Sequence, residues 1–401
     1  MRPPTTVSKL AEKLSWLIAA ILILLPKKWL AYSWTVRLFG LYVLLHLGLG
    51  GWALAHHQVN STALIYALII NLRFIGFFIL CAAVASQSDF LRRNWRSILL
   101  IPAGVVIVVG LVQKLFLPYD FLRHFGYGND TIPTYQTVDL NLDYRRIQST
   151  LRGANPLGAY LVLIIPALWL GLKNNRRLRT SAVIASLWVL YFSYSRSAEI
   201  GAALALSLVV WWGLGKKIPL QRIAMLLLAL SVLAGAGLYA FRDSQPVQDT
   251  LFHTSDSSTS ATSSNAVRVQ AMKDGVSSII HQPLGGGPGT AGPASARNDH
   301  PARIAENYFL QIGQEVGIIG IAMFVAINIL VAKELWAKRA KQQLAKTLFA
   351  SLVGLTFVNL LSHAWTDDTL AYLWWGLAGV ALAPILNIKR KQDEKNKFSS
   401  T

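Results

Sequence analysis

Long apolar stretches, separated by short basic connections, constrain this chain more than any other feature of its sequence. A helix that spans a bilayer needs about 20 mostly apolar residues, and such stretches recur from one end of the chain to the other. Hydrophobic residues make up 53% of the 401 residues and charged residues only 14%, against about 25% charged in an average soluble protein. The sequence therefore predicts an all-α integral membrane protein.

The apolar stretches predict about eleven transmembrane helices, within a range of about ten to twelve. They run over 12–26, 38–55, 62–86, 97–117, 155–172, 180–193, 198–214, 220–240, 307–332, 347–364 and 370–387. The stretches 12–26 and 180–193 are shorter than a full crossing, so we expect them to be tilted, broken or re-entrant.

Lys and Arg indicate the orientation. The net charge of +19 comes mostly from basic runs in alternate connections, a pattern typical of cytoplasmic loops beside anionic lipid and not of nucleic-acid binding. With the basic tail 389–391 inside, the long segments 118–154 and 242–306 lie on the outer face. One conflict remains, because eleven spans also place the basic N-terminus outside.

The predicted topology divides the chain into five segments. These are N-terminal transmembrane helices (1–117), an outer loop (118–154), central transmembrane helices (155–240), a large outer loop (241–306), and C-terminal transmembrane helices with a basic cytoplasmic tail (307–401). The larger loop contains a predicted amphipathic helix at 266–280 and a Gly/Pro-rich turn. Since loops this long are usually functional or disordered, we expect the catalytic site there.

Two polar groups stand where central spans begin. The segment 152–156 (Arg-Gly-Ala-Asn-Pro) has Asn155 at the expected cap and Pro at the first helical position, a regular helix start. Alternatively, Arg152 joins that helix N-terminus in binding an anion. At 195–197 (Ser-Arg-Ser), Arg196 either extends to the membrane interface or binds an anion with the helix dipole, held by Glu199.

A third group lies in the larger loop. Arg268 sits on the amphipathic segment, where it is either a solvated residue or a ligand. The run 283–290 (Pro-Leu-Gly-Gly-Gly-Pro-Gly-Thr) includes Gly286, Gly287 and Gly289, whose backbone N–H groups can approach a ligand closely. No Lys-Ser or Lys-Thr follows, so the run is not a Walker A loop.

The fourth group opens the span 307–332. Glu306 is either a helix-capping residue or a functional carboxylate beside Asn307. Glu315 lies about two turns into an apolar helix, where an ionisable group is a functional candidate. His363 and the Asp pair at 367–368 stand at the same boundary and are also consistent with ordinary loop polars. No His-x-x-x-His or Cys-x-x-Cys occurs, so no metal site is expected.

In their order and spacing these groups resemble the O-antigen ligase and O-antigen polymerase (Wzy-type) family of bacterial membrane proteins. The resemblance covers roughly 145–325. It implies a glycosyltransferase of polysaccharide and cell-envelope biosynthesis that takes a glycan from an undecaprenyl diphosphate carrier. The resemblance also implies that the reaction takes place at the outer face of the bacterial cytoplasmic (inner) membrane. The acceptor is a lipid or protein in ligases and another carrier-linked glycan in polymerases, and no cofactor is implied.

The resemblance also implies roles for individual residues. Arg196 and Arg268 match the arginines thought to hold the diphosphate in the ligases. The ligases carry a His, then Asn, Ser or Gln, and then Gly-x-x-Gly. Here the spacing from Asn307 to 317–320 is kept, but Glu306 replaces the His. This departure fits a polymerase-like member or a ligase whose base is a carboxylate.

We therefore expect Glu306, Arg196 and Arg268 to be catalytic, without a metal and with inversion at the anomeric carbon. The expected substrate-binding residues are Arg152, Asn155, Gly286, Gly287, Gly289, Asn307 and Glu315. A transporter of a polar or lipid-linked solute is the competing interpretation, because short broken helices and intramembrane Arg73 and Glu315 suit one. A third is an assembly protein that would tolerate loss of all three catalytic candidates.

Overall fold

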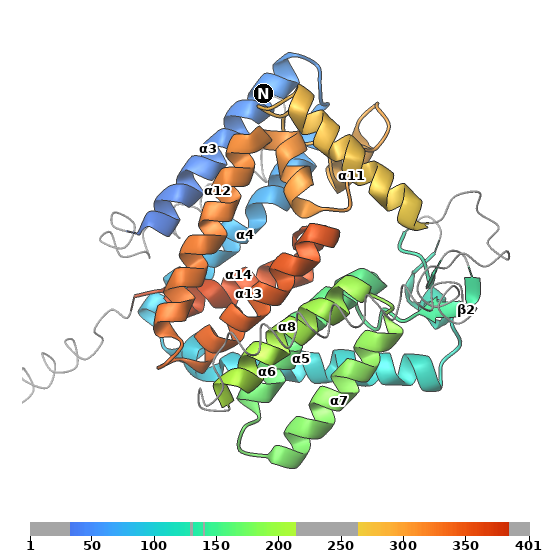
Figure 1. The fold of residues 1–401 in the computed structure, drawn as a ribbon, viewed down its shortest axis with the longest axis vertical. Coiled ribbons are helices and arrows are strands. Elements are labelled where there is room, and N and C mark those ends of the chain that lie inside the picture. Colours follow the sequence, from blue (N-terminus) through green and yellow to red (C-terminus); the bar gives the residue numbers. More distant parts are fainter. Residues whose placement is uncertain (1–32, 129–130, 139–140, 214–263, 385–401) are drawn as a thin grey trace, which may run out of the picture.

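The computed structural model describes residues 33–128, 131–138, 141–213 and 264–384, and this part of the chain is mainly helical (Figure 1). The long helices are α3 (Trp34–Ala55), α4 (Ser61–Gln87), α5 (Phe90–Leu115), α6 (Ala154–Gly171), α7 (Arg176–Phe192), α8 (Arg196–Gly213), α11 (Ser264–His281), α12 (Tyr308–Lys338), α13 (Gln343–Leu361) and α14 (Asp368–Leu382). The short elements are η1 (Phe121–Phe125), β1 (Gln136–Val138), β2 (Asn141–Arg146), η3 (Pro293–Arg297) and η4 (Ala364–Thr366). The helix expected at 266–280 is confirmed as α11.

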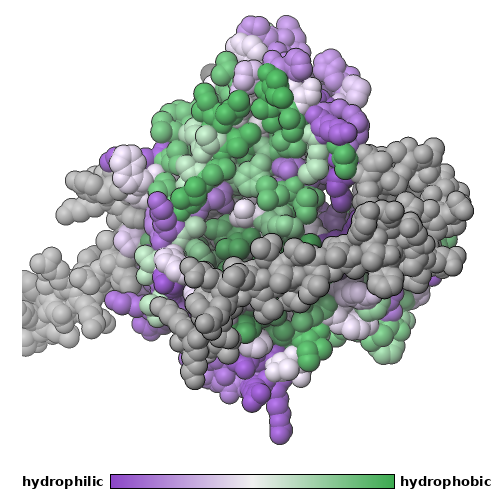
Figure 2. Space-filling view, viewed as in Figure 1, coloured by the Kyte–Doolittle hydropathy of each residue, from purple (hydrophilic) through white to green (hydrophobic). Residues whose placement is uncertain are grey.

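Six helices in the described ranges are long and apolar enough to span a membrane, namely α3, α4, α5, α6, α12 and α13. Helices α7 and α14 have 17 and 15 residues, so they are shorter than a full crossing. The predicted spans 12–26 and 220–240 lie outside the described residues. The multi-pass helical class is supported, while the count of about eleven spans is not confirmed. Figure 2 shows the apolar surface as a broad band between hydrophilic ends.

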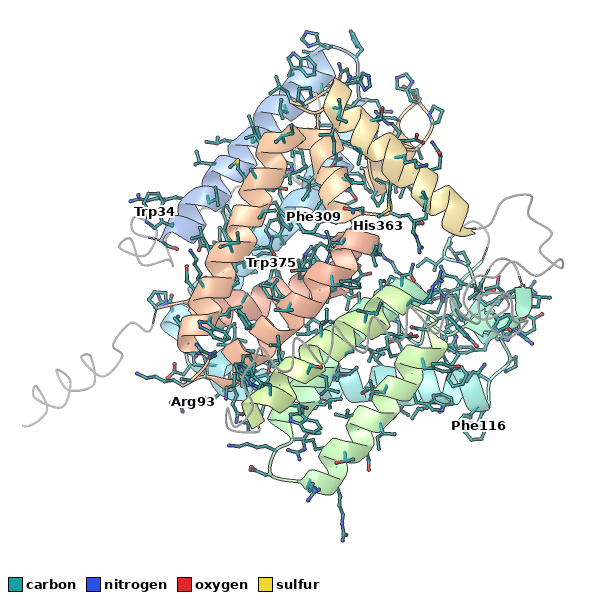
Figure 3. The ribbon with its side chains drawn as sticks, in the orientation of Figure 1. Trp34, Arg93, Phe116, Phe309, His363 and Trp375 are labelled. Atoms are coloured by element: carbon teal, nitrogen blue, oxygen red, sulfur yellow. The ribbon has the colours of Figure 1, made fainter. Side chains whose placement is uncertain are left out.

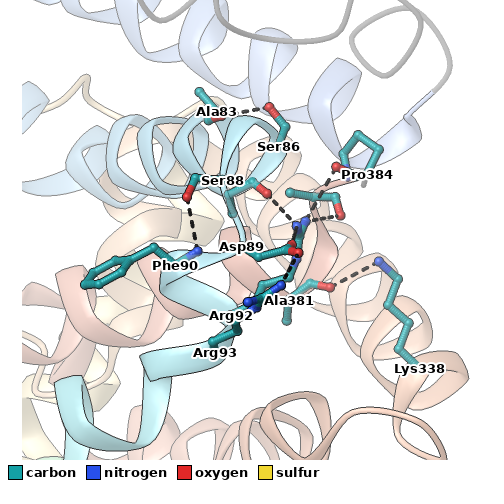
Figure 4. Close-up of polar contacts among 12 residues, drawn as sticks. Ala83, Ser86, Ser88, Asp89, Phe90, Arg92, Arg93, Lys338, Ala381 and Pro384 are labelled. Atoms are coloured by element: carbon teal, nitrogen blue, oxygen red, sulfur yellow. Dashed lines mark hydrogen bonds and ion pairs between the residues drawn. The ribbon is translucent and has the colours of Figure 1, made fainter. Parts of the chain in front are cut away.

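Basic side chains bind backbone carbonyls at the end of the bundle where α12 and α14 end (Figure 4). Arg92 donates from Nη2 to the carbonyl of Ala383 at 2.8 Å. Lys338 donates from Nζ to the carbonyls of Ala381 and Leu382 at 3.1 and 3.0 Å. Cations here satisfy carbonyls that a helix C-terminus leaves unbonded and favour its negative dipole end.

The buried core explains how a helix as short as α14 is held. Trp374 and Trp375 are fully buried, and the rings of Phe74 and Trp375 lie 4.6 Å apart. The indole N–H of Trp374 donates to Oγ of Ser351 at 3.0 Å, so this buried donor is satisfied. Helices α4 and α13 thus pack against α14 and bury its two tryptophans.

A small antiparallel sheet departs from the expected all-α fold. Strands β1 and β2 pair with Gln136 opposite Arg146 and Thr137 opposite Arg145. The side chain of Gln136 accepts a hydrogen bond from the backbone N–H of Ala154 at 3.0 Å. The expectation that Asn155 caps this helix is therefore wrong: α6 begins at Ala154 with Gly153 at the cap position, and Gln136 satisfies a helix-start donor instead.

Helix α12 is broken where the sequence predicts a continuous span. Gly317 has φ 70° and ψ −172°, a backbone conformation that favours glycine. The segment 283–290, which we call the glycine segment, supplies the missing bonds. The N–H groups of Gly286 and Gly287 donate to the carbonyls of Gln314 and Glu315 at 2.9 and 2.8 Å. Irregular backbone at membrane depth is tolerated where protein satisfies it in this way.

Candidate functional site

An ion pair between Arg268 and Glu306 forms the centre of the candidate site. The Nε and Nη2 atoms of Arg268 lie 2.8 and 2.7 Å from the same carboxylate oxygen, Oε2 of Glu306. Their side chains are 35% and 39% exposed, so the pair is accessible to a ligand. Helix α11 carries the arginine, and the carboxylate precedes α12. Two residues that the sequence selected separately are thus in direct contact.

The backbone holds Glu306 in an unusual conformation. Its φ is 49°, a left-handed value that costs a non-glycine residue about 1–3 kcal/mol and that recurs at functional sites. The next residues are fixed on both sides. Asn307, not Glu306, caps α12 by accepting from the N–H of Leu310 at 3.0 Å, and its Nδ2 donates to the carbonyl of Leu360 at 2.7 Å. The capping interpretation of Glu306 is therefore wrong, and its carboxylate is left to pair with Arg268.

Arg146, which the sequence did not single out, lies close enough to this pair for their charges to interact. Arg146 ends strand β2 and donates from Nε to the carbonyl of Ser193 at 2.8 Å and from Nη2 to Oδ1 of Asn155 at 2.5 Å. It therefore ties β2 to the starts of α6 and α8. Burial and, to a smaller extent, the charges of Arg268 and Arg196 lower the pKa of Arg146 to about 10, while the charge of Glu306 opposes them.

Arg196 is the first residue of α8 and is exposed. The preceding turn has Tyr194 at φ 50°, and the carbonyl of Tyr194 accepts from Nη2 of Arg146 at 3.4 Å. Arg146 thus supports the turn that presents Arg196. Since the charge of Arg196 acts on Arg146 and on Glu199, the helix start combines a guanidinium with the positive end of the helix dipole.

We call Arg146, Arg196, Arg268 and Glu306 the arginine cluster. Its members lie at the end of β2, at the start of α8, within α11 and just before α12, so only the folded chain brings them together. Like charges placed together in a partly buried site favour a bound anion, because an anion relieves both their repulsion and their desolvation. An exposed carboxylate beside them adds a proton acceptor.

Arg152 lies nearby but has carboxylate partners in the same protein. Its Nε is 3.3 Å from Oδ2 of Asp367, and its Nη2 is 3.8 Å from Oδ1 of Asp368. Its Nη2 also donates to the carbonyl of Thr366 at 3.2 Å. These contacts tie the connection before α6 to the start of α14. The predicted role of Arg152 in binding an anion stays a prediction.

His363 is a second residue that the sequence left undecided. It lies in the connection between α13 and α14, close to the start of α12 (Figure 3). Burial lowers the pKa of His363; the charge of Glu306 opposes this, and Arg152 and Arg268 reinforce it. Its buried Nδ1 has no hydrogen-bond partner. His363 therefore lies where the charges of Glu306, Arg152 and Arg268 act on it, and it carries an unsatisfied ring nitrogen.

The remaining predicted binding residues form a separate region at the break of α12. Glu315 is buried, and its carboxylate accepts from Nδ2 of Asn71 at 2.7 Å and from the N–H of Gly289 at 2.8 Å. The N–H groups of Gly286 and Gly287 are engaged by α12, as described above. These contacts show a packing role for the glycine segment, while its role in binding substrate stays a prediction.

Close packing explains why glycine is required in that segment. A Cβ on Gly287 would collide with Ala53, and its φ of 96° disfavours any other residue. A Cβ on Gly285 would lie 2.6 Å from the carbonyl oxygen of Glu315. The spacing of these glycines therefore follows from the approach of the segment to α3 and α12.

Fold and site together define a multi-pass helical membrane protein that presents three arginines and one carboxylate at one end of its helices. Comparison with known families then gives the particular group. Residues 181–325 match the model of the O-antigen ligase family. This match confirms, over that range, the resemblance that the sequence motifs indicated. No curated protein matches the chain.

The matched range contains three of the four residues of the arginine cluster, Arg196, Arg268 and Glu306. Arg146 and His363 lie outside it. The available signal for Arg146 was a pair of arginines in a segment otherwise rich in Tyr, Asp and Asn. His363 stood at a predicted boundary, but only the fold places it near Glu306.

Proposed function

We propose that this protein is a glycosyltransferase that transfers or polymerises undecaprenyl diphosphate-linked glycan at the outer face of the bacterial cytoplasmic membrane. The observation that carries the proposal is the arginine cluster, in which Glu306 pairs with Arg268 within the field of Arg146 and Arg196. The family match supports the glycan substrate. The positive-inside rule supports the orientation, because Arg92 and Lys338 lie at the opposite end of the bundle from the cluster.

In this proposal the arginines stabilise the leaving group. The donor diphosphate carries at least two negative charges, and its negative charge increases when the sugar departs. Guanidinium groups remain charged and bind phosphate oxygens bidentately. Charge held in advance at the right position is often the largest catalytic contribution. Arg196 and Arg268 would contact the diphosphate, and Arg146 would hold the turn before Arg196 while adding its own charge. This stabilisation requires no metal.

Glu306 would act as the general base. The acceptor hydroxyl gives its proton to the Glu306 carboxylate as its oxygen attacks the anomeric carbon. The bond from that carbon to the diphosphate oxygen breaks, and its electron pair stays on the diphosphate. Because one base assists one direct displacement, the product has inverted anomeric configuration. The strained backbone at Glu306 fits a carboxylate positioned for such a task.

The other predicted residues would complete the donor site. Asn155 and Asn307 hold Arg146 and the start of α12 in place through the bonds described above. Arg152 would add charge at the edge of the site, next to Asp367. The glycine segment and Glu315 would fix the break in α12, so that Glu306 keeps its position relative to the membrane.

Purified protein with an undecaprenyl diphosphate-linked oligosaccharide tests the proposal, with EDTA present and with or without a lipid or peptide acceptor. Elongated carrier-linked product without added acceptor would identify a polymerase. Product only with added acceptor would identify a ligase. Absence of turnover with each donor and acceptor, from protein that elutes as a single folded species, would contradict the proposal.

A transporter is the second candidate, and the broken α12 with buried Glu315 favours it, because transporters bind solutes at discontinuous helices. Here, however, the glycine segment bonds the carbonyls of Gln314 and Glu315 that the break leaves free. A transporter would need that site open to a solute. Uptake of solute by vesicles containing the protein, without any glycan transfer, would favour this alternative.

A further inference from the structure

A cavity lies beside the arginine cluster, and Arg146 belongs to both. Its volume is about 240 Å³, and it lies between the end of α5 and strand β2. Phe116, labelled in Figure 3, marks the end of α5 next to this region. Small-molecule sites usually measure about 300–1,000 Å³, so this cavity suits a ligand of one sugar ring more than a longer oligosaccharide.

The lining of the cavity is positively charged. Lys114, Arg145 and Arg146 contribute basic groups to it. The charge of Arg145 acts on Lys114. Arg145 is also held in place, because its Nε donates to the carbonyl of Leu142 at 2.6 Å. Fixed cations that face one another in a cavity favour an anionic ligand.

Aromatic rings form the second part of the lining. Tyr119 and Tyr135 lie edge to face with centroids 4.8 Å apart, and the guanidinium of Arg145 stands 4.9 Å above the ring of Tyr119. Tyr119 is 47% exposed, so one side of its ring is available to a ligand. Such a ring can pack against the C–H face of a sugar while its hydroxyl stays hydrated.

The cavity is connected to the proposed site of transfer through one residue. Arg146 lines the cavity, and its charge interacts with Arg196, Arg268 and Glu306. A sugar bound in the cavity would therefore lie next to the reacting ends of the glycans. The cavity is too small to hold the diphosphate and a sugar together. Its ligand would therefore be another sugar unit of the glycan, next to the diphosphate-linked one.

We infer that this cavity binds a carboxylate-bearing sugar unit of the glycan, with Lys114, Arg145 and Arg146 on the carboxylate and Tyr119 against the ring. The inference rests on the proposed function, because it names the class of glycan that the enzyme takes. A carboxylate with two or more guanidinium or ammonium donors forms charge-assisted hydrogen bonds, which are about twice as strong as neutral ones. A neutral sugar of the same size would not form these charge-assisted hydrogen bonds.

Ligand-observed NMR on the purified full-length protein in detergent provides the test, with glucuronate, glucose and glycerol 3-phosphate as probes. We expect glucuronate to bind at least about tenfold more tightly than glucose, since each hydrogen bond to a charged group contributes about that much. Arg145→Gln and Lys114→Gln should each reduce this ratio. Arg123→Gln, an exposed arginine of the same segment that does not line the cavity, should leave it unchanged.

Substitutions of Tyr119 distinguish the contribution of ring packing to binding from that of charge. Tyr119→Ala should weaken glucuronate and glucose together, and Tyr119→Phe should restore both. Equal binding of glucuronate and glucose would overturn the inference. So would an unchanged ratio in folded Arg145→Gln and Lys114→Gln protein. Tighter binding of glycerol 3-phosphate than of glucuronate would overturn it in favour of a lipid headgroup.

The binding measurement is independent of transfer. Discrimination between the two sugars in a protein that never turns over would contradict the proposed function and leave the cavity inference standing. Turnover by a protein that binds glucuronate and glucose equally would contradict the cavity inference alone.

Discussion

The glycine segment and the arginine cluster contain most of the residues that the sequence singled out, yet their physical states differ. In the glycine segment, backbone donors meet the carbonyls of a broken helix, and Glu315 is bonded on both oxygens. In the arginine cluster, the charges of Arg196 and Arg268 act on Arg146 beside the half-exposed carboxylate of Glu306. Groups that satisfy each other stabilise a fold, whereas like charges held together favour a ligand of opposite charge.

The carboxylate of the cluster gives the largest expected effect. Glu306→Ala should lower the turnover rate by about 10²–10⁴, the usual contribution of a general base. Glu306→His should retain more activity than Glu306→Ala, because the resembling ligases carry His at this position. Asp274→Ala, an exposed acid on α11, is the matched control. Wild-type turnover in folded Glu306→Ala protein would remove Glu306 from the mechanism.

Replacement of Arg268 or Arg196 should give the next largest effect on the turnover rate. Arg268→Ala and Arg196→Ala are each expected to lower the rate by about 10²–10³, as loss of one oxyanion donor does. Lysine at either position should not fully restore the rate, since it lacks the planar fork of arginine. Lys273→Ala on α11 controls for loss of a positive charge nearby. The assay is the transfer reaction with a carrier-linked oligosaccharide, and an unaffected rate in either alanine variant would contradict that arginine's role.

A bound anion should stabilise the cluster without any reaction. Inorganic pyrophosphate at about 100 times its Kd should raise the free energy of unfolding by about 2.7 kcal/mol. The effect should shrink in Arg268→Ala protein. Thermal unfolding in detergent, followed by tryptophan fluorescence, measures it. An equal rise in wild-type and Arg268→Ala protein would show that pyrophosphate binds elsewhere.

The contribution of the glycine segment to stability should depend on its close packing. Gly287→Ala is expected to lower the free energy of unfolding by about 1–3 kcal/mol, because the added methyl group meets Ala53. Gly126→Ala is the matched control, since Gly126 also has a positive φ of 83° but no heavy atom within 4 Å of an added Cβ. Equal losses in the two variants would attribute the effect to backbone conformation alone.

His363 should give the smallest effect, in the dependence of stability on pH. Burial lowers its pKa from the ordinary 6.5, so the unfolded chain binds its proton more readily than the folded chain. The stability that neutral His363 contributes is present above pH 6.5 and is lost as the pH falls through the lowered folded pKa. His363→Gln should remove this part of the acid sensitivity. Identical pH profiles of thermal unfolding would show that His363 does not contribute.

Local sequence patterns were sufficient for several features. Apolar stretches located helices α3 to α8 and α12 to α14, and the amphipathic period located α11, because both signals depend only on residues close in the chain. Short motifs marked Arg196, Arg268 and Glu306. The broken helix α12 escaped prediction, since its apolar run continues through the break.

Tertiary structure decided which of the marked residues meet. It paired Arg268 with Glu306. It also placed Arg152 next to the carboxylates of Asp367 and Asp368. It also brought Arg146 into the cluster through a hairpin that no apolar pattern predicts. By itself the sequence determined a helical membrane chain with its polar groups at helix starts. The pairing of charges depended on how helices distant in sequence pack, because long-range contacts are set by shape and burial and not by spacing along the chain.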